Sequence, residues 1–356
     1  MGNIMNSIAI MSRVIIAFGG LGLMLTSGLA NAQTAAEFYE DRQMRLLLSS
    51  DAGGGYAAYA ISFAPFLSKH LPGDPNIIVD YMPGAGGIRA MNYLYANGEQ
   101  DGSLIALVHS SVPFAPLYGI EGAQFDSLEM QWLGSMNATS GICVAWHASG
   151  VRTWQDLFDK DYFVGGSGAG SQMETLPMML NKLFGTEIKV ISGYRGGNEV
   201  YVAMERGEVD GRCGTLVSSI NSTRPDWFPD QRVFVPVQIA MERNPQFPNS
   251  VAIGELAKDD LTRNILKLVL SPMDIDRPLL APPGVPADRV EALRTAFHNA
   301  MNDPGFIAAA ASVQIEIKET SNERVTEVIA AAYAMPPEVV QAANGAMNLT
   351  GASFGQ

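Results

Sequence analysis

The sequence predicts an α/β fold that is long enough for two domains of ordinary size. From residue 44 onward, short apolar segments with strand character alternate with segments of helical character. This order is typical of sheets covered by helices. The composition agrees with a folded core, because 47% of the 356 residues are hydrophobic and 17% are charged.

The first group of predicted elements extends to residue 111. Strands are predicted at 44–50, 76–82 and 103–111, and helices at 56–70 and 88–97. The strands are short apolar runs, and the segment after the first glycine cluster has the apolar spacing of a helix. Because strands and helices alternate, we expect a parallel sheet with helices on both faces.

A second group begins near residue 141. Its strands are predicted at 141–149, 187–194, 209–216 and 232–241, with a strand and loop over 162–171, helices at 153–158 and 173–185, and a loop and helix over 195–208. Pro282, Pro283 and Pro286 then mark a loop, and a helix with one apolar face follows. The tail after Pro337 is rich in alanine, glycine and asparagine, and we expect it to be loosely held.

The N-terminus, residues 1–32, is predicted to be a cleaved export signal. Arg13 precedes an apolar run over 14–25, and Ala30 and Ala32 give the A-x-A form of a cleavage site. A membrane anchor is the alternative, but the run is short and rich in glycine. Met11 is an alternative start of the chain. Since no later stretch could span a bilayer, we expect the mature protein outside the cytoplasm.

Charge and metal-ligand content exclude several classes of function. The net charge is −13 and no run of lysine and arginine occurs, which argues against nucleic acid and anionic membranes as partners. The four histidines are scattered, so we expect no metal and no cofactor. Cys143 and Cys213 could form a disulfide in an oxidising compartment. Each lies in a strand-like apolar run, however, and we favour two buried thiols.

Four loops rich in glycine or small residues follow predicted strands, at 49–56, 82–87, 109–113 and 165–171. In an open parallel sheet such loops lie at the carboxyl ends of the strands, where ligands bind. Glycine lets the backbone approach a ligand, and a helix that begins directly afterwards adds unpaired N–H groups and its positive end. One loop alone would indicate only a tight turn, but four in corresponding places predict a site for an anion.

Motifs of enzymes fit this sequence poorly. The glycines of GGSGAG are two apart each time, which is not the dinucleotide spacing, and no phosphate-binding G-x-x-x-x-G-K-[ST] occurs. Ser167 is not a nucleophile of the G-x-S-x-G type, because Ala169 occupies the last position. We therefore predict no catalytic residue and no enzyme. A secreted enzyme acting on a small acid is the alternative, with Asp51, His109 and Asp210 as candidate acid–base groups.

Several segments, in order, resemble the periplasmic solute-binding proteins of tripartite tricarboxylate transporters. They are DAGGGYAAYAISFAP (51–65), DYMPGAGG (80–87), YRGGNEVYVAMERGEVD (194–210) and APPGVPADRVEAL (281–293), which NDPGF follows. The resemblance extends from about Met44 to Val325. Each segment alone is weak, and their shared order indicates the family.

The resemblance implies a two-lobed periplasmic binding protein of the Venus-flytrap type, with the ligand in a cleft between the lobes. The implied division is a signal peptide at 1–32, a first lobe at 33–138 plus 276–335, a second lobe at 139–275 and a C-terminal tail at 336–356. Such a protein would be a monomer that binds a small aliphatic or aromatic carboxylate and delivers it to membrane transporter subunits. A sensor that binds the acid and signals to a membrane kinase is a further alternative with the same fold.

The resemblance also implies ligand-binding residues. In the first lobe they would be Ala52, Gly53, Gly54, Tyr56, Ala85, Gly86, Ser110 and Ser111, and in the second lobe Ser167, Gly170, Ser171, Arg195 and Asp210. Many relatives place Thr-Asp after the first glycines, where the aspartate can meet a ligand ammonium. Here these positions are Tyr56 and Ala57, so an amino-acid ligand is less expected.

Two further side-chain roles stay open at this stage. Tyr59 could line an aromatic-friendly pocket beside Tyr56, or it could pack in the core one helical turn further on. Arg195 and Arg212 could hold a second carboxylate by paired hydrogen bonds. Solvation at the surface, or an ion pair with a neighbouring carboxylate such as Glu199, is the commoner fate of such arginines.

Overall fold

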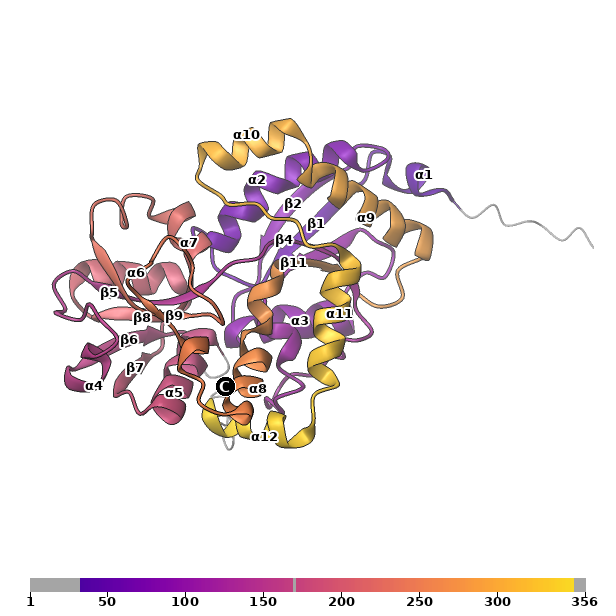
Figure 1. Cartoon of the computed structure of the whole chain (residues 1–356). Helices are drawn as coiled ribbons and strands as arrows, with labels where there is room; N and C mark the ends of the chain where they lie inside the picture. The colour runs from indigo at the N-terminus through magenta and orange to yellow at the C-terminus, as the bar shows by residue number, and fades with distance from the viewer. Residues whose placement is uncertain (1–32, 169–170, 349–356) are drawn as a thin grey trace, which may run out of the picture. The chain divides into compact units, whose positions relative to one another are not determined.

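Two mixed β-sheets organise the chain, and helices cover both of them (Figure 1). The computed structural model describes residues 33–168 and 171–348. The predicted export signal, residues 1–32, lies outside the described residues.

The first sheet has the strand order β2-β1-β3-β11-β4. Strand β1 (Gln43–Leu48) lies between β2 (Asn76–Tyr81) and β3 (Leu104–Leu107) and runs parallel to both. Strand β11 (Asp276–Ala281) runs antiparallel to β3 and to β4 (Gln131–Asn137). The sheet therefore combines strands from two distant parts of the sequence.

The second sheet has the strand order β10-β9-β5-β8-β6-β7. Its strands are β5 (Gly141–Trp146), β6 (Tyr162–Gly166), β7 (Ile188–Ser192), β8 (Gly211–Leu216), β9 (Val233–Ile239) and β10 (Val251–Ala252). Strands β7, β6 and β8 run parallel, whereas β5 runs antiparallel to both of its neighbours, β8 and β9.

The predicted parallel pairing is confirmed for β1, β2 and β3, but antiparallel pairings that the sequence did not predict complete both sheets. Parallel neighbours need a crossover of a dozen or more residues, usually through a helix, and the β1, β2 and β3 segments have such crossovers. Strand β5 instead enters its sheet directly from the first sheet, and β11 is reached from the second sheet through the helix Asp260–Leu270. The chain leaves the first sheet at Asn137 and starts β5 at Gly141, and it returns through a short helix, Ser271–Ile275, that leads straight into β11. The lobe boundaries stay a prediction.

The helices fill the connections between strands. They are α1 (Ala35–Tyr39), α2 (Gly55–His70), α3 (Ile88–Asn97), α4 (Asp156–Asp159), α5 (Gln172–Phe184), α6 (Gly197–Arg206), α7 (Val217–Thr223), α8 (Asp260–Leu270), α9 (Ala287–Met301), α10 (Pro304–Ser312), α11 (Asn322–Tyr333) and α12 (Pro337–Ala346). None of the helices in the described ranges has both the length and the apolar character needed to cross a bilayer.

Strand β1 illustrates how the core forms on both faces of a sheet. Successive side chains of a strand point to opposite faces. Leu46 and Leu48 accordingly pack with α2, α9 and α10, whereas Leu47 packs in a separate cluster that includes α3 and α11. All three leucines are buried, which explains why this strand is an unbroken apolar run.

The C-terminal segment corrects the expectation of a loosely held tail. Residues 337–346 form α12, whose buried residues Val339, Ala343 and Ala346 recur on one face of the helix. This face packs against α8 and α5 (Figure 1). The composition misled because alanine and asparagine are common in loops, but the apolar spacing is that of a helix. Residues 349–356 lie outside the described residues.

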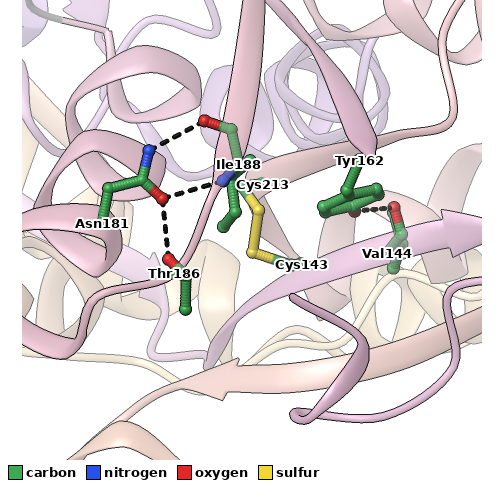
Figure 2. The surroundings of a disulfide bond; sticks show 7 residues. All are labelled: Cys143, Val144, Tyr162, Asn181, Thr186, Ile188 and Cys213. Carbon is green, nitrogen blue, oxygen red and sulfur yellow. Dashed lines mark hydrogen bonds between the residues drawn. A yellow bond between two sulfur atoms is a disulfide. The ribbon is translucent and has the colours of Figure 1, made fainter. Parts of the chain in front are cut away.

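Cys143 and Cys213 form a disulfide, so the expectation of two buried thiols is wrong (Figure 2). Cys143 lies in β5 and Cys213 in β8, which are adjacent antiparallel strands. The register of this pair shifts between Ile142 and Val144, and Gly214, with φ +66°, provides the extra residue of the bulge. The sequence alone does not give this register, and the register decides whether the two sulfur atoms meet.

Side-chain hydrogen bonds tie neighbouring elements together around the disulfide (Figure 2). Tyr162 donates its hydroxyl to the carbonyl of Val144 at 2.7 Å. On α5, Asn181 donates to the carbonyl of Ile188 at 2.8 Å and accepts from the Ile188 N–H at 2.9 Å. The Thr186 hydroxyl also donates to Asn181, at 2.7 Å. These bonds fix α5 to the start of β7.

We expect the disulfide to stabilise the fold substantially. It closes a loop with a sequence separation of 70, and constraint of the unfolded chain by a native disulfide contributes about 2–4 kcal/mol. Reduction of the wild type should lower the free energy of unfolding by that amount in urea titrations. The Cys143→Ala/Cys213→Ala variant is the control, since reductant should leave its unfolding curve unchanged. Equal unfolding free energies of oxidised and reduced wild type would contradict this prediction.

Candidate functional site

A cavity lies where loops that follow strands of both sheets meet. Its empty volume is ≈ 860 Å³, including open solvent at its mouth. The lining residues come from the segments 49–56, 84–87 and 109–111 on the side of the first sheet, and from Ser167, 171–173, 195–201 and 212–219 on the side of the second.

Three helices begin at this cavity. Gly55 is the first residue of α2, Gln172 of α5 and Gly197 of α6, and all three residues line the cavity. The first N–H groups of a helix have no partner within it. In α2 the first intrahelical bond is that of the Ala58 N–H to the Gly54 carbonyl, at 3.1 Å. The unpaired N–H groups and positive ends of three helices make the cavity suitable for an anion.

The loop at residues 84–87 presents backbone to the same cavity. Gly84, Ala85, Gly86 and Gly87 all have positive φ angles, of 138°, 46°, 65° and 107°. Such a run is accessible mainly to glycine, and Ala85 is the exception that the neighbouring glycines hold in place. Gly86 points its carbonyl at His109, whose Nδ1 lies 3.0 Å away. Because a carbonyl can only accept, Nδ1 of His109 must carry the hydrogen.

His109 lines the cavity as a neutral side chain. The backbone N–H of His109 donates to Oγ of Ser49 at 2.9 Å. The imidazole ring packs edge-on against the ring of Tyr56, with centroids 4.6 Å apart. Burial lowers the pKa of His109 to about 4, against the opposing effect of the Gly86 carbonyl. At neutral pH its Nε2 can accept a hydrogen bond, because Nδ1 carries the only ring hydrogen, and the side chain brings no positive charge.

Tyr56 lines the cavity, and its hydroxyl is bonded within the protein. The hydroxyl donates to Oδ1 of Asp276 at 3.3 Å and accepts from the Ser110 N–H at 3.1 Å. Tyr59 does not line the cavity, because it is fully buried and its hydroxyl donates to the carbonyl of Glu316. Tyr59 therefore packs in the core and does not line a pocket beside Tyr56.

A buried ion pair lies beneath Tyr56. Arg277 and Asp276 are fully buried and pair with each other. The guanidinium of Arg277 stacks on the ring of Tyr56, 3.9 Å from its centroid, and donates to Oγ of Ser219 at 2.9 Å. Ser218 donates to the other carboxylate oxygen of Asp276 at 3.0 Å. Burial raises the pKa of the Asp276 carboxyl, and the adjacent Arg277 opposes this rise.

The comparisons with known proteins agree with this geometry. A sequence model of the tripartite tricarboxylate transporter family receptors matches residues 64–344. This chain belongs to that family. A comparison with curated proteins gives no significant match.

Solved structures with the same fold support the family assignment. The periplasmic binding protein BugD is 17% identical with a TM-score of 0.67, and the alignment covers 86% of this chain and 98% of BugD. The malate-bound MatC of Rhodopseudomonas palustris is 16% identical with a TM-score of 0.64, over 86% and 99% of the two chains. The adipate-bound Rpa4515 of R. palustris is 16% identical with a TM-score of 0.65, over 85% and 97%. The receptor-family chain therefore has the periplasmic binding protein fold.

The cavity of this receptor-family protein gathers part of the predicted site. Gly54, Tyr56, Gly86, Ser111, Ser167, Ser171 and Arg195 line it. Ala52, Gly53 and Ala85 are exposed and Ser110 is buried, and none of these four lines the cavity. Gly170 lies outside the described residues. The predicted loops are therefore at the cavity, but in some of them a neighbouring residue takes the lining position.

Asp210, another residue of the predicted site, does not line the cavity. It immediately precedes β8, and its carboxylate accepts the Phe163 N–H at 3.0 Å. Strand β8 runs parallel to β6, so the start of β8 and the loop after β6 lie at opposite edges of the sheet. The residues of β8 that line the cavity are Arg212, Gly214 and Leu216.

The predicted set also missed lining residues. Gly196, Gly197 and Asn198 follow β7 and begin α6, the same strand–glycine–helix pattern that the four predicted loops have. This pattern is visible in the sequence, but the predicted site includes only Arg195 of this segment. Ser219 carries no such local signal, because no glycine loop precedes α7. Arg212, which the sequence analysis names as a possible partner of a second carboxylate, also lines the cavity.

The lowered pKa of His109 predicts a pH effect on stability. As pH falls from 7 toward 4, an unfolded histidine gains its proton near pH 6.5, whereas folded His109 stays neutral until about pH 4. Wild type should therefore lose up to roughly 3 kcal/mol of stability over this interval relative to His109→Gln. Urea titrations from pH 7.5 to 4.5 measure this difference. The exposed His147→Gln variant should follow the wild type, and parallel curves for wild type and His109→Gln would contradict the prediction.

Proposed function

We propose that this protein binds a small organic carboxylate in the cavity and delivers it to membrane transporter components outside the cytoplasm. The observation that carries the proposal is that α2, α5 and α6 all begin at one cavity. Family membership and the malate and adipate bound to two proteins of the same fold support it. The ligand acid would lie with one carboxylate at the start of α2.

The strength of such binding follows from local groups. Hydrogen bonds from N–H groups to a charged acceptor contribute about 1.5–3 kcal/mol each, and a helix N-terminus adds about 0.3–1 kcal/mol. The net charge of −13 opposes an anion, but salt screens that repulsion beyond about 8 Å. A few main-chain donors at short range would therefore outweigh the charge of the whole molecule.

Residues from both sheets surround the same cavity, and this favours a ligand that holds them together. A ligand that contacts the start of α2 on one side and the starts of α5 and α6 on the other would stabilise the closed arrangement through contacts made only there. A receptor that delivers its ligand to a transporter needs such a difference in structure between its ligand-bound and ligand-free states.

We expect Gly54→Val to abolish carboxylate binding while the fold persists. A Cβ at this position would meet Oδ1 of Asp51 at 3.4 Å, an ordinary contact, and the backbone of Gly54 is extended. The isopropyl group would occupy the place of the carboxylate at the start of α2. Calorimetry with succinate, malate, adipate and benzoate should show a loss of affinity of at least 100-fold.

The matched control is Gly345→Val on α12, where an added Cβ meets nothing within 4 Å. This variant should bind as the wild type does, and both variants should unfold cooperatively. Wild-type affinity in folded Gly54→Val would contradict the proposed position of the carboxylate. Conversion of any of these acids to a product by the wild type would favour the enzyme alternative, for which Asp51 and His109 line the cavity.

A further inference from the structure

The charged side chains of the cavity differ in how well they are paired. Arg195 is largely exposed and pairs with Glu199 at 3.3 Å. Arg212, in contrast, has no ion pair within the described ranges, and its buried Nε has no hydrogen-bond partner there. Buried polar atoms without a partner are uncommon in folded proteins and call for an explanation. Arg212 is therefore the cavity cation whose hydrogen-bonding capacity the protein leaves unused.

The surroundings of Arg212 hold its guanidinium in place without neutralising it. The guanidinium stacks on Tyr201, 4.8 Å from the ring centroid. On another side it lies against Gly197, where any Cβ would overlap the guanidinium. Arg212 directly precedes Cys213, whose disulfide to β5 anchors β8. A rigid strand, an aromatic ring and a glycine thus position this planar cation.

Two more unpaired donors line the same side of the cavity. Oγ of Ser171 and Nε2 of Gln172 are buried and have no hydrogen-bond partner among the described residues. Ser171 is only 6% exposed, and both residues stand at the start of α5, whose first N–H groups are unpaired as well. Together with Arg212, these groups form a second set of hydrogen-bond donors that could bind an anion, separate from the start of α2.

We propose that Arg212, Ser171 and Gln172 form a subsite for a second acidic group, so that the ligand is a dicarboxylate. One carboxylate lies at the start of α2, as in the proposed function on which this inference rests, and the other accepts paired hydrogen bonds from Arg212. A guanidinium matches a carboxylate through two parallel N–H···O bonds. Arg212 then decides specificity, because an acid with an apolar far end would leave it buried and unpaired.

Asp51 is the cavity residue that favours a different ligand. Its side chain packs against Gly196, and burial raises the pKa of its carboxyl, with Arg212 and Arg195 opposing the rise and Glu199 adding to it. A charged Asp51 would attract a ligand with an ammonium at its far end and disfavour a second carboxylate. The competing ligand class is therefore an amino acid, and a decisive experiment must include one.

The experiment uses ligands matched in length and different at one end. Calorimetry of the full mature chain compares succinate, butyrate and 4-aminobutyrate, and then adipate, hexanoate and 6-aminohexanoate. Wild type should bind at least one of the diacids at least tenfold more tightly than the monoacid of the same length. Arg212→Gln should lose that preference, with at least tenfold weaker diacid binding and less than threefold change for the monoacid, and Arg212→Lys should be intermediate.

Arg152→Gln is the matched control. The guanidinium of Arg152 also stacks on an aromatic ring, 4.5 Å from the centroid of Phe234, but it does not line the cavity, so its loss removes one positive charge and should leave all affinities within threefold. Thermal unfolding checks that the variants are folded.

The outcomes separate the two proposals. If wild type binds diacids and monoacids equally and Arg212→Gln changes nothing, the second subsite is wrong and carboxylate binding stands. If an amino acid binds most tightly, Asp51 recognises the far end and the dicarboxylate inference is overturned. If no acid binds the wild type, the proposed function itself fails.

Discussion

The cavity depends on the buried guanidinium of Arg277. This side chain is fully buried in β11, yet it reaches the rings of Tyr56 and Tyr59 on α2 and the hydroxyl of Ser219 on α7. Removing one partner of a buried ion pair leaves an uncompensated charge, which is strongly destabilising. The start of α2 is therefore fixed relative to α7 by a group that tolerates little rearrangement, and the unpaired N–H groups of α2 stay at the cavity.

This anchoring explains how a polar cavity survives without internal partners. A helix N-terminus beside flexible polar side chains would recruit one of them as a cap. Here the first residues of α2 and α6 are glycines, the hydroxyl of Tyr56 is engaged by Asp276 and Ser110, and His109 is held by the Gly86 carbonyl. The Tyr56 hydroxyl and the His109 ring are thus bonded elsewhere, and neither caps the start of α2.

Local patterns in the sequence predicted β1, β2, β3 and the glycine loops after them, because strand, glycine and helix follow each other directly there. What failed depended on partners far away in the chain. The disulfide needed the register of β5 against β8, the place of Asp210 needed the direction of β8, and the role of α12 needed α5 and α8 as neighbours. The sequence names Arg212 as one possible partner of a second carboxylate, but its unpaired state is visible only when the surrounding residues are known.

The unliganded cavity is costly in free energy, and this cost makes selectivity possible. An unpaired buried donor such as Nε of Arg212 destabilises the protein by about 1–3 kcal/mol unless water or a ligand satisfies it. A ligand that supplies the missing acceptor removes this cost, whereas one that excludes water without supplying it increases the cost. An unpaired donor thus favours a ligand that offers it an acceptor over a ligand that leaves it without one. Because Asp51 brings a carboxyl to the same cavity, the proposed site would distinguish ligands by the group at their far end and not by total charge.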